Sequence, residues 1–193
     1  MEQRSDEELL KGSLKGHKGD FKVLLERYEG ELFNFLYHTI GDRQAAEDLF
    51  QEAFLQVFSN VERFRSGARF RPWLYTIAAN LARDEMRRRR RRKGLSLDAE
   101  VHPGEDTTLA ELVDSHSADP AALAAEDETK TMAAEMMDAL PASLREVVVL
   151  HFYNDMKYTE ISEALGLPMG TVKSRLYRAI REMTDTMRRK RGF

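Results

Sequence analysis

The sequence predicts an all-α protein with two small helical domains, an N-terminal helical bundle and a C-terminal helix-turn-helix, joined by an acidic flexible linker. Apolar residues recur at steps of three and four in both halves, which is the spacing of an amphipathic helix. Alternation with a period of two is nowhere sustained, so we expect no sheet. Between the halves, no Lys or Arg occurs from Gly94 to Thr129. We therefore predict domains at 1–93 and 131–193, with the linker at 94–130.

The first long helix is expected to begin after Asp20, because a carboxylate at that position suits an N-cap. Its apolar stripe consists of Phe21, Leu24, Leu25, Tyr28, Leu32, Phe35 and Leu36. Gly41 and Asp42 are expected to end this helix and to open a turn. The stripe predicts one face buried against neighbouring helices.

Two more amphipathic helices complete the predicted bundle. The stripe of the second consists of Ala46, Leu49, Ala53, Val57 and Val61. Gly67 interrupts the pattern, and Pro72 suits the first turn of a third long helix. That helix carries Trp73, Ile77, Leu81 and Met86 along one line and runs into the arginines at 87–92. Three such helices with short connections form a small bundle.

The charge pattern separates the two halves. The net charge is only -3, but residues 87–93 are all Arg or Lys and the following segment is acidic. Pro103, Gly104 and Pro120 fall in this segment, whose periodicity is weak. We interpret it as a mostly extended linker, with short helical patches compatible with 109–113 and 121–128. The chain becomes basic again at 188–191.

The last third of the chain has the pattern of a helix-turn-helix. A helix after Pro141 is expected to carry Leu144, Val147, Val148 and His151. Thr159 is the expected N-cap of a short helix over 160–165, and Gly166 occupies its C-cap. Pro168 opens the final helix after a Gly-Leu-Pro turn. Two helices joined in this way can place the second in the major groove of DNA.

The final helix has two different faces. Val172, Leu176, Ala179 and Met183 form the face expected to pack. The other face carries Thr171, Ser174, Arg175 and Arg178, with Lys173 on its flank. Hydroxyl and guanidinium groups contact base edges and phosphates, and the N–H groups of the helix start can bind phosphate. This segment therefore predicts a DNA-binding protein.

Composition excludes several other classes. There is no cysteine, and therefore no disulfide framework, thiol catalysis or thiolate metal site. No apolar run approaches the roughly 20 residues of a membrane span, and no secretory signal pattern opens the chain, so we expect a cytoplasmic protein. We find no nucleophile elbow, phosphate-binding glycine loop or carboxylate–histidine constellation, and hence expect no catalytic residues. The histidines lack ligand spacing, so we expect no metal and no cofactor.

Both halves together resemble a bacterial sigma factor of the sigma-70 family, in the two-domain extracytoplasmic-function (ECF) form. The resemblance rests on GDRQAAEDLFQEAFLQVF at 41–58, FRSGARFRPWLYTIAANLARDEMRRRR at 64–90 and LPASLREVVVLHFYNDMKYTEISEALGLPMGTVKSRLYRAIREM at 140–183. The helix-turn-helix alone is only moderately specific. Its combination with AEDLFQEAF and RPWLYTIAANLARD, in this order and spacing, is highly specific.

The resemblance implies roles for matching residues. Core-polymerase binding, on the clamp helices, falls to Asp48, Leu49, Gln51 and Glu52. Capture of the unwound -10 element falls to Phe64, Trp73, Asn80, Arg83, Arg87 and Arg88. Recognition of the duplex -35 element falls to Gly170, Thr171, Lys173, Ser174, Arg175 and Arg178. Met169 departs from the family, in which a polar or acidic residue is frequent at that position.

The implied partners are core RNA polymerase, through the clamp helices and flap of its two largest subunits, promoter DNA, and an anti-sigma factor. The anti-sigma factor is expected to cover both the polymerase-binding and the DNA-binding faces and could hold the chain at the membrane, without membrane insertion of the chain itself. The acidic linker matches the connector that runs near the polymerase active site. An acidic strand there could mimic nucleic acid until growing RNA displaces it.

Alternatives remain for single residues and for the whole chain. Asp48 and Glu52 could form a solvated helix face, and Phe64, Trp73 and Asn80 could serve packing instead of DNA contact. The arginine run could be a localisation signal or a generic RNA patch. The alternative function is a free-standing helix-turn-helix regulator, which would bind duplex DNA as a symmetric dimer. The AEDLFQEAF segment resembles no ligand-binding or dimerisation module, which disfavours this alternative.

Overall fold

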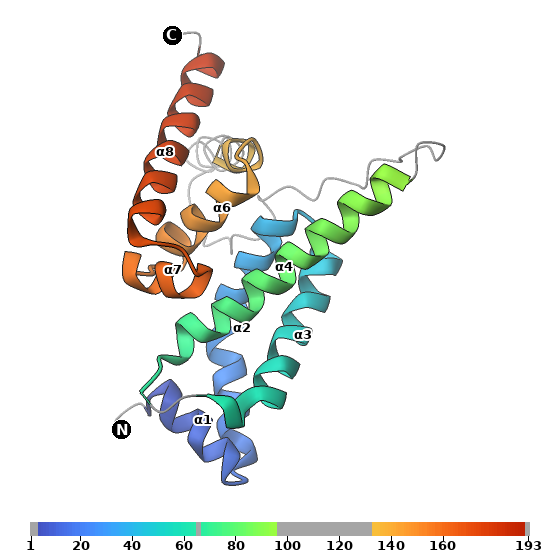
Figure 1. Ribbon diagram of the computed structural model, residues 1–193, viewed down its shortest axis with the longest axis vertical. Coiled ribbons are helices and arrows are strands. Elements are labelled where there is room, and N and C mark those ends of the chain that lie inside the picture. Colours follow the sequence, from blue (N-terminus) through green and yellow to red (C-terminus); the bar gives the residue numbers. More distant parts are fainter. Residues whose placement is uncertain (1–3, 65–66, 96–132, 192–193) are drawn as a thin grey trace, which may run out of the picture.

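The computed structural model describes residues 4–64, 67–95 and 133–191, and these residues are helical throughout, with turns but no strand between the helices (Figure 1). The N-terminal part contains α1 (Asp6–Leu14), α2 (Lys18–Ile40), α3 (Arg43–Asn60), the 3₁₀ turn η1 (Val61–Arg63) and α4 (Phe70–Leu95). The C-terminal part contains a short helix at 133–138, α6 (Ala142–Val148), the π-helical segment η3 (Val149–Tyr153), α7 (Tyr158–Leu165) and α8 (Met169–Arg191). The predicted all-α class is confirmed. Apart from the two residues that end α4, the predicted linker lies outside the described residues.

The helix α1 was not anticipated from the sequence. Ser5 and Glu8 form a capping box, in which the Glu8 amide donates to Ser5 Oγ at 3.2 Å and the Ser5 amide donates to Glu8 Oε2 at 2.9 Å. Such reciprocal bonds satisfy amides that the start of a helix leaves without partners. Leu9 and Leu10 are buried, so α1 is part of the bundle core.

The start of α2 differs from the expectation. The helix begins at Lys18, and Asp20 lies in its first turn instead of at the N-cap. There the Asp20 carboxylate accepts from both terminal nitrogens of Arg4, at 2.6 and 2.9 Å. A carboxylate is favourable anywhere in the first turn, next to the positive end of the helix dipole, so its position did not define the N-cap.

The predicted junction between α2 and α3 is confirmed. Gly41 adopts a left-handed conformation with φ of 71° at the C-cap of α2, where a side chain would be strained. Asp42 is the N-cap of α3, and its carboxylate accepts from the Ala45 amide at 2.9 Å. Almost the whole predicted stripe of each helix is buried, with Phe21 and Leu25 at its partly exposed edge.

The buried face of α4 is displaced by one residue from the predicted line. Leu74, Ala78 and Ala82 are completely buried, together with Tyr75 and Ala79. The predicted line of Trp73, Ile77, Leu81 and Met86 is only partly buried. The alanines carry little apolar weight in a sequence pattern, yet their small size allows α4 to lie close to its neighbours.

The helix-turn-helix is confirmed with one corrected boundary. The helix α7 begins at Tyr158, so Thr159 is an exposed second residue and not the N-cap. The Lys157 amide before the helix is bonded instead by the Glu160 carboxylate, at 2.9 Å. Gly166 ends α7 with φ of 63°, as predicted. In α8, Val172, Leu176 and Ala179 are buried.

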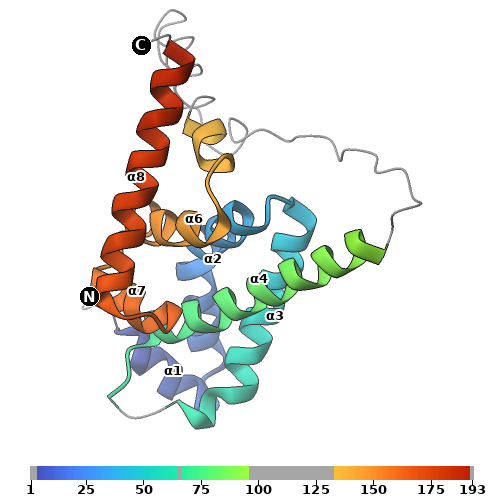
Figure 2. The same cartoon turned by 45° about the horizontal axis from the view of Figure 1, so that its top comes forward.

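The two parts pack against each other. The helix α4 lies beside α7, and α2 contacts both α6 and η3 (Figures 1 and 2). One cluster of buried side chains extends through both parts. Residues of the C-terminal part therefore cover some of the surface of α4.

Candidate functional site

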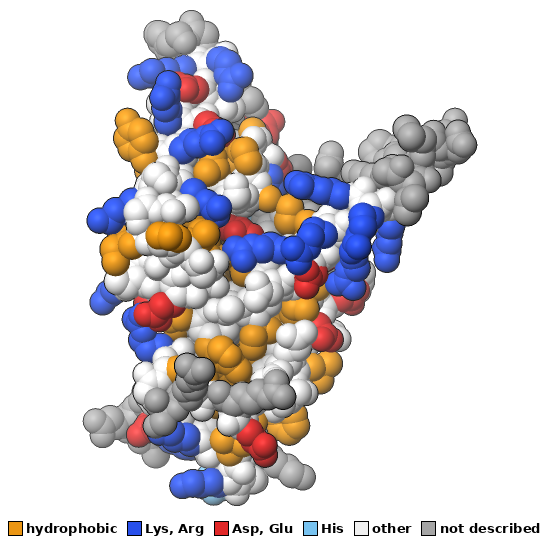
Figure 3. Space-filling view, in the orientation of Figure 1, with side chains coloured by type: hydrophobic (Ala, Val, Ile, Leu, Met, Phe, Trp, Pro, Cys, Tyr) orange, Lys and Arg blue, Asp and Glu red, His pale blue; other side chains and the backbone are white. Residues whose placement is uncertain are grey.

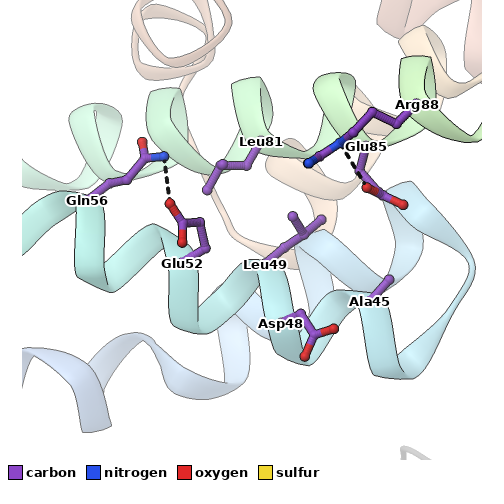
Figure 4. A pocket seen from close by; sticks show the side chains of 8 residues that line it. All are labelled: Ala45, Asp48, Leu49, Glu52, Gln56, Leu81, Glu85 and Arg88. Carbon is purple, nitrogen blue, oxygen red and sulfur yellow. Dashed lines mark hydrogen bonds and ion pairs between the residues drawn. The ribbon is translucent and has the colours of Figure 1, made fainter.

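A groove between α3 and α4 brings together three of the four predicted polymerase-binding residues. It has a volume of about 620 Å³ and is lined by Ala45, Asp48, Leu49, Glu52, Gln56, Leu81, Glu85 and Arg88. Leu49 and Leu81 lie between the two helices, with the carboxylates of α3 beside them (Figure 4). Gln51 is exposed on α3 but does not line the groove. The groove thus combines an apolar floor with a negatively charged side.

The carboxylates of Asp48 and Glu52 are available to a partner. Both side chains are exposed and lie one helical turn apart. Each is contacted by a neutral amide, Gln44 at 3.4 Å and Gln56 at 3.0 Å, and within the described parts of the chain neither forms an ion pair. A basic surface could therefore bind this side of the groove without displacing an existing cation.

Most of the predicted -10 residues share one face of α4. Trp73, Asn80, Arg83 and Arg87 follow one another at intervals of seven, three and four residues, which aligns them along the helix. Asn80 and Arg87 are exposed, whereas Trp73 and Arg83 are partly buried. Figure 3 shows Lys and Arg side chains gathered over the C-terminal half of α4. Arg88 departs from this face, because it lines the α3–α4 groove and pairs with Glu85 at 3.2 Å.

An aromatic cluster supports the start of this face. The ring centroids of Phe64 and Trp73 are 5.0 Å apart, and both rings also pack near the completely buried Phe70. Trp73 forms one wall of a pocket of about 420 Å³. The remaining lining residues are Gly67, Ala68, Arg69, Pro72, Thr76 and, from α7, Glu163. The tryptophan therefore both packs and faces an open pocket.

Carboxylates from the C-terminal part pair with the cations of α4 and of the residues before it. Arg83 binds Glu146 through two bonds of 3.0 and 3.2 Å, and Glu146 is only 3% exposed. Arg69 binds Glu160 at 3.2 Å and Glu163 at 2.8 Å. A predicted -10 residue, Arg83, is therefore engaged by α6 in this structure.

A buried polar node joins the two parts and was not foreseen from the sequence. Asn154 is 2% exposed, and its side-chain amide donates to the Tyr75 hydroxyl at 2.9 Å and to the Glu31 carbonyl at 3.1 Å. Arg71 donates to the Asn154 carbonyl and to the Glu31 carboxylate. Burial and the nearby Glu31 raise the pKa of Tyr75, which keeps its hydroxyl protonated. No sequence pattern signals this node, because its members are far apart along the chain.

The predicted -35 face of α8 is open. Gly170, Lys173, Ser174 and Arg178 are exposed, and Thr171 and Arg175 are partly exposed. Arg178 pairs with Glu182 at 2.8 Å on the same helix, and Arg175 donates a 3.4 Å hydrogen bond to the Ser143 carbonyl. The first turn of a helix leaves amides without intrahelical partners, so this end of α8 also offers N–H donors.

A second groove, which is mainly apolar, lies in the C-terminal part. Its volume is about 270 Å³, and it is lined by Ala133, Met136, Met137, Val148, Phe152, Tyr153, Ile180, Met183, Thr184 and Met187. Phe152 and Ile180 are exposed. Flexible methionines on an apolar surface suit the docking of a partner's amphipathic helix.

Comparison with known proteins assigns the family. Sigma-70 region 2 matches residues 24–92, and Sigma-70, region 4, matches residues 131–183. The ECF RNA polymerase sigma factor SigW of Bacillus subtilis is 30% identical over 174 residues, which are 90% of this chain and 92% of SigW. The RNA polymerase sigma-H factor of Pseudomonas aeruginosa is 31% identical over 189 residues, covering 96% and 94% of the two chains.

This chain belongs to the sigma-70 family and is an ECF sigma factor. Solved structures share the fold. The sigma factor RpoE of Bartonella quintana, in complex with the anti-sigma factor NepR, superimposes with a TM-score of 0.69 at 23% identity, covering 88% of this chain and 97% of RpoE. CnrH in complex with the cytosolic domain of CnrY gives 0.67 at 21% identity, covering 95% and 97%.

Membership resolves the choice between function classes. ECF sigma factors are non-enzymatic subunits that bind core RNA polymerase and promoter DNA, so this chain is a transcription initiation factor and not a free-standing regulator or an enzyme. Among the described helices, none is both long and apolar enough to cross a membrane.

Proposed function

We propose that this ECF sigma factor directs core RNA polymerase to promoters through three separate surfaces. The α3–α4 groove binds the clamp helices, the neighbouring face of α4 captures the unwound -10 strand, and α8 reads the -35 duplex. This proposal is supported by the distribution of the predicted residues of α4 over two different faces of the helix. Arg88 lines the groove, whereas Asn80 and Arg87 are exposed on the other face. Residues 1–93 and 131–193 are the proposed domains.

The α3–α4 groove suits a basic helical partner. Leu49 and Leu81 provide apolar contact, and Asp48 and Glu52 provide charges that steer association. Gln51 lies outside the groove lining, where it can contact the rim of a bound helix. Arg88 remains neutralised by Glu85 and does not oppose a basic partner.

The -10 surface combines stacking, polar and charged groups. Trp73 and its pocket can accept an unstacked base, and Phe64 holds the tryptophan ring from behind. Asn80 can bond a base edge, and Arg83 and Arg87 can follow the phosphates once they are released from their carboxylate partners, Glu146 and Asp84. Arg88 also lines the α3–α4 groove, and its contact with -10 DNA stays a prediction.

The -35 surface is formed by the exposed side of α8. Lys173, Ser174 and Arg178 face solvent, and the helix start at Gly170 offers a backbone donor. Arg175 lies between this face and α6, within reach of a base edge. This arrangement supports major-groove recognition by a single helix.

The apolar groove of the C-terminal part is the proposed contact for the polymerase flap. Its methionines and Phe152 can enclose the apolar face of a short helix. The similar fold of RpoE, solved in complex with the anti-sigma factor NepR, supports control by an anti-sigma factor. We place the protein in the cytoplasm, where such a factor can hold it, at the membrane if the factor is anchored there.

Co-elution with bacterial core RNA polymerase tests the groove. We expect the wild type to co-elute and the double variant Asp48→Lys, Glu52→Lys to be lost from the complex, because the reversed charges repel a basic partner. The matched control is Glu26→Lys, Glu29→Lys, which makes the same charge change on exposed positions of α2. Equal co-elution of the groove variant and the control would show that the groove does not bind polymerase.

A further inference from the structure

The helix α1 lies before the segment that matches Sigma-70 region 2, yet it is tied firmly into the bundle. Asp6 accepts from both the Arg27 guanidinium and the Tyr28 hydroxyl. Burial and the nearby Asp6 raise the pKa of Tyr28, so the hydroxyl remains a proton donor. These contacts fix α1 against α2. Glu7, the residue after Asp6, then lies toward α4.

Glu7 bonds the first amide of α4. Its Oε1 accepts from the Phe70 backbone N–H at 2.9 Å, across 63 residues of sequence. The residue before this helix, Arg69, has no side-chain acceptor and cannot act as an N-cap. A carboxylate supplied by another helix serves that purpose here, and it also complements the positive end of the α4 dipole.

Phe70 is also part of the aromatic cluster behind the pocket of Trp73. The Phe70 ring is completely buried, packs edge-on against Tyr28 at 5.5 Å, and lies 6.2 Å from Trp73. The helix α1 therefore holds the Phe70 backbone through Glu7, and its ring through Asp6 and Tyr28. Trp73 is one turn further along α4, so its placement depends on how this end of the helix is held.

We propose that Glu7 is a positioning residue for -10 strand capture, acting from α1 on the N-terminus of α4 and thereby on Trp73 and its pocket. This proposal rests on the proposed function of that pocket. It gives α1 a role in DNA melting although Glu7 itself contacts no nucleotide. It also separates Glu7 from its neighbour Glu8, whose carboxylate caps α1 alone.

Three variants separate positioning from stability. Glu7→Ala removes the acceptor for the Phe70 amide, and Glu7→Gln keeps an acceptor oxygen without the charge. Glu8→Ala removes a carboxylate from the same helix and weakens only the cap of α1. The probe is a fork-junction DNA with a duplex -35 element and a single-stranded -10 element. Its sequence is the one that wild-type holoenzyme selects from a randomised duplex library.

Each variant is assembled with core polymerase and titrated with the fork junction and with the fully duplex upstream fragment. We expect Glu7→Ala to weaken fork-junction binding about five- to tenfold, the size of one lost hydrogen bond, without changing the affinity for the duplex fragment. Glu7→Gln should recover most of the loss, and Glu8→Ala should remain within about twofold of wild type.

A second measurement reads the pocket directly. Trp73 is the only tryptophan of the chain, so the tryptophan fluorescence of the free chain, measured without core polymerase, reports on this site alone. Acrylamide should quench it more strongly in Glu7→Ala than in the wild type, Glu7→Gln or Glu8→Ala. Unchanged quenching and unchanged fork-junction binding in Glu7→Ala would overturn the proposal, as would an equal loss of duplex binding. Failure of the wild type to assemble with core polymerase would overturn the proposed function, and this inference with it.

Discussion

Different side chains are proposed to bind core polymerase, the -10 strand and the -35 duplex, and substitution of Arg175 tests whether these functions are separate. Replacing it with Ala should weaken -35 recognition by about 1–3 kcal/mol, because a guanidinium contact to a base edge is lost. Core binding should not change, since Arg175 lines neither the α3–α4 groove nor the apolar groove of the C-terminal part. Electrophoretic mobility shifts of the holoenzyme and co-elution with core polymerase measure the two effects.

Arg181 provides the control for that experiment. It is an exposed arginine further along α8 and pairs with Asp185 at 4.0 Å. Arg181→Ala should leave -35 recognition nearly unchanged. Equal losses of core binding and -35 binding in Arg175→Ala would contradict the separation of surfaces.

His38 makes the stability of the fold depend on pH. Its ring is buried beside Tyr37 and Tyr153, and this burial, followed by the charge of Arg145, lowers its pKa below the ordinary 6.5 against an opposing effect of Asp138. Below 6.5 the unfolded chain binds a proton that the folded chain does not. The free energy of unfolding should therefore be flat above that pH and fall as the pH decreases toward the folded-state pKa.

Urea unfolding between about pH 7.5 and about pH 5.5 measures this slope. His38→Asn removes the titrating group and should flatten the dependence in this range. The lowered pKa of Asp42, held by the Ala45 amide, affects stability only at more acidic pH. An identical slope in the wild type and the variant would assign the effect to other groups.

At the scale of helices, the sequence predicted the regular elements and their turns but not the contacts between them. The glycines at 41 and 166 and the stripes of α2 and α3 were correctly placed, because these signals are local. The caps assigned to Asp20 and Thr159 were wrong, because Asp20 lies in the first turn of α2, bonded to Arg4, and because Glu160 bonds the Lys157 amide before α7. The role of α1 depends on a bond from Glu7 to Phe70 that no local pattern encodes.

The candidate site was predictable to a similar extent. The resemblance to sigma factors indicated Asp48, Leu49 and Glu52, and the structure brings these three into one groove. It also grouped Arg88 with Arg87; neighbouring residues of a helix point about 100° apart, and Arg88 lines the α3–α4 groove whereas Arg87 does not. The polar bonds across the two parts escaped prediction, because they pair residues that are distant in the sequence.

The turn of the helix-turn-helix gives a prediction at this scale. Gly166 has φ of 63° and is exposed, with open space around its Cα. Gly166→Ala should therefore lower the free energy of unfolding by about 1–2 kcal/mol through backbone strain alone. Gly170→Ala, in a helical position, is the control and should not destabilise. Chemical denaturation measures the free energy of unfolding of both variants. Equal values for Gly166→Ala and Gly170→Ala would show that the turn tolerates a side chain.

For the whole molecule, the buried node at Asn154 stabilises the packing of the two parts. Asn154→Ala leaves the Tyr75 hydroxyl and the Glu31 carbonyl without their donor and should lower the free energy of unfolding by about 1–3 kcal/mol. Asn80→Ala, an exposed asparagine on α4, is the control. Thermal and denaturant unfolding should separate the two variants. Equal stability would mean that the node contributes nothing.

The ion pair between Arg83 and Glu146 links two equilibria, the packing of α6 on α4 and the proposed binding of the -10 strand by Arg83. Glu146 occupies the Nε and one terminal nitrogen of the Arg83 guanidinium, so the proposed contact of Arg83 with a DNA phosphate competes with its contact with α6. The coupling between these two events is reciprocal. If binding of the -10 strand favours separation of α6 from α4 by some factor, then separation of the two helices increases the affinity for the strand by the same factor. On the proposed role of Arg83, a protein that holds α6 against α4 would therefore oppose promoter opening, and one that separates the two helices would favour it.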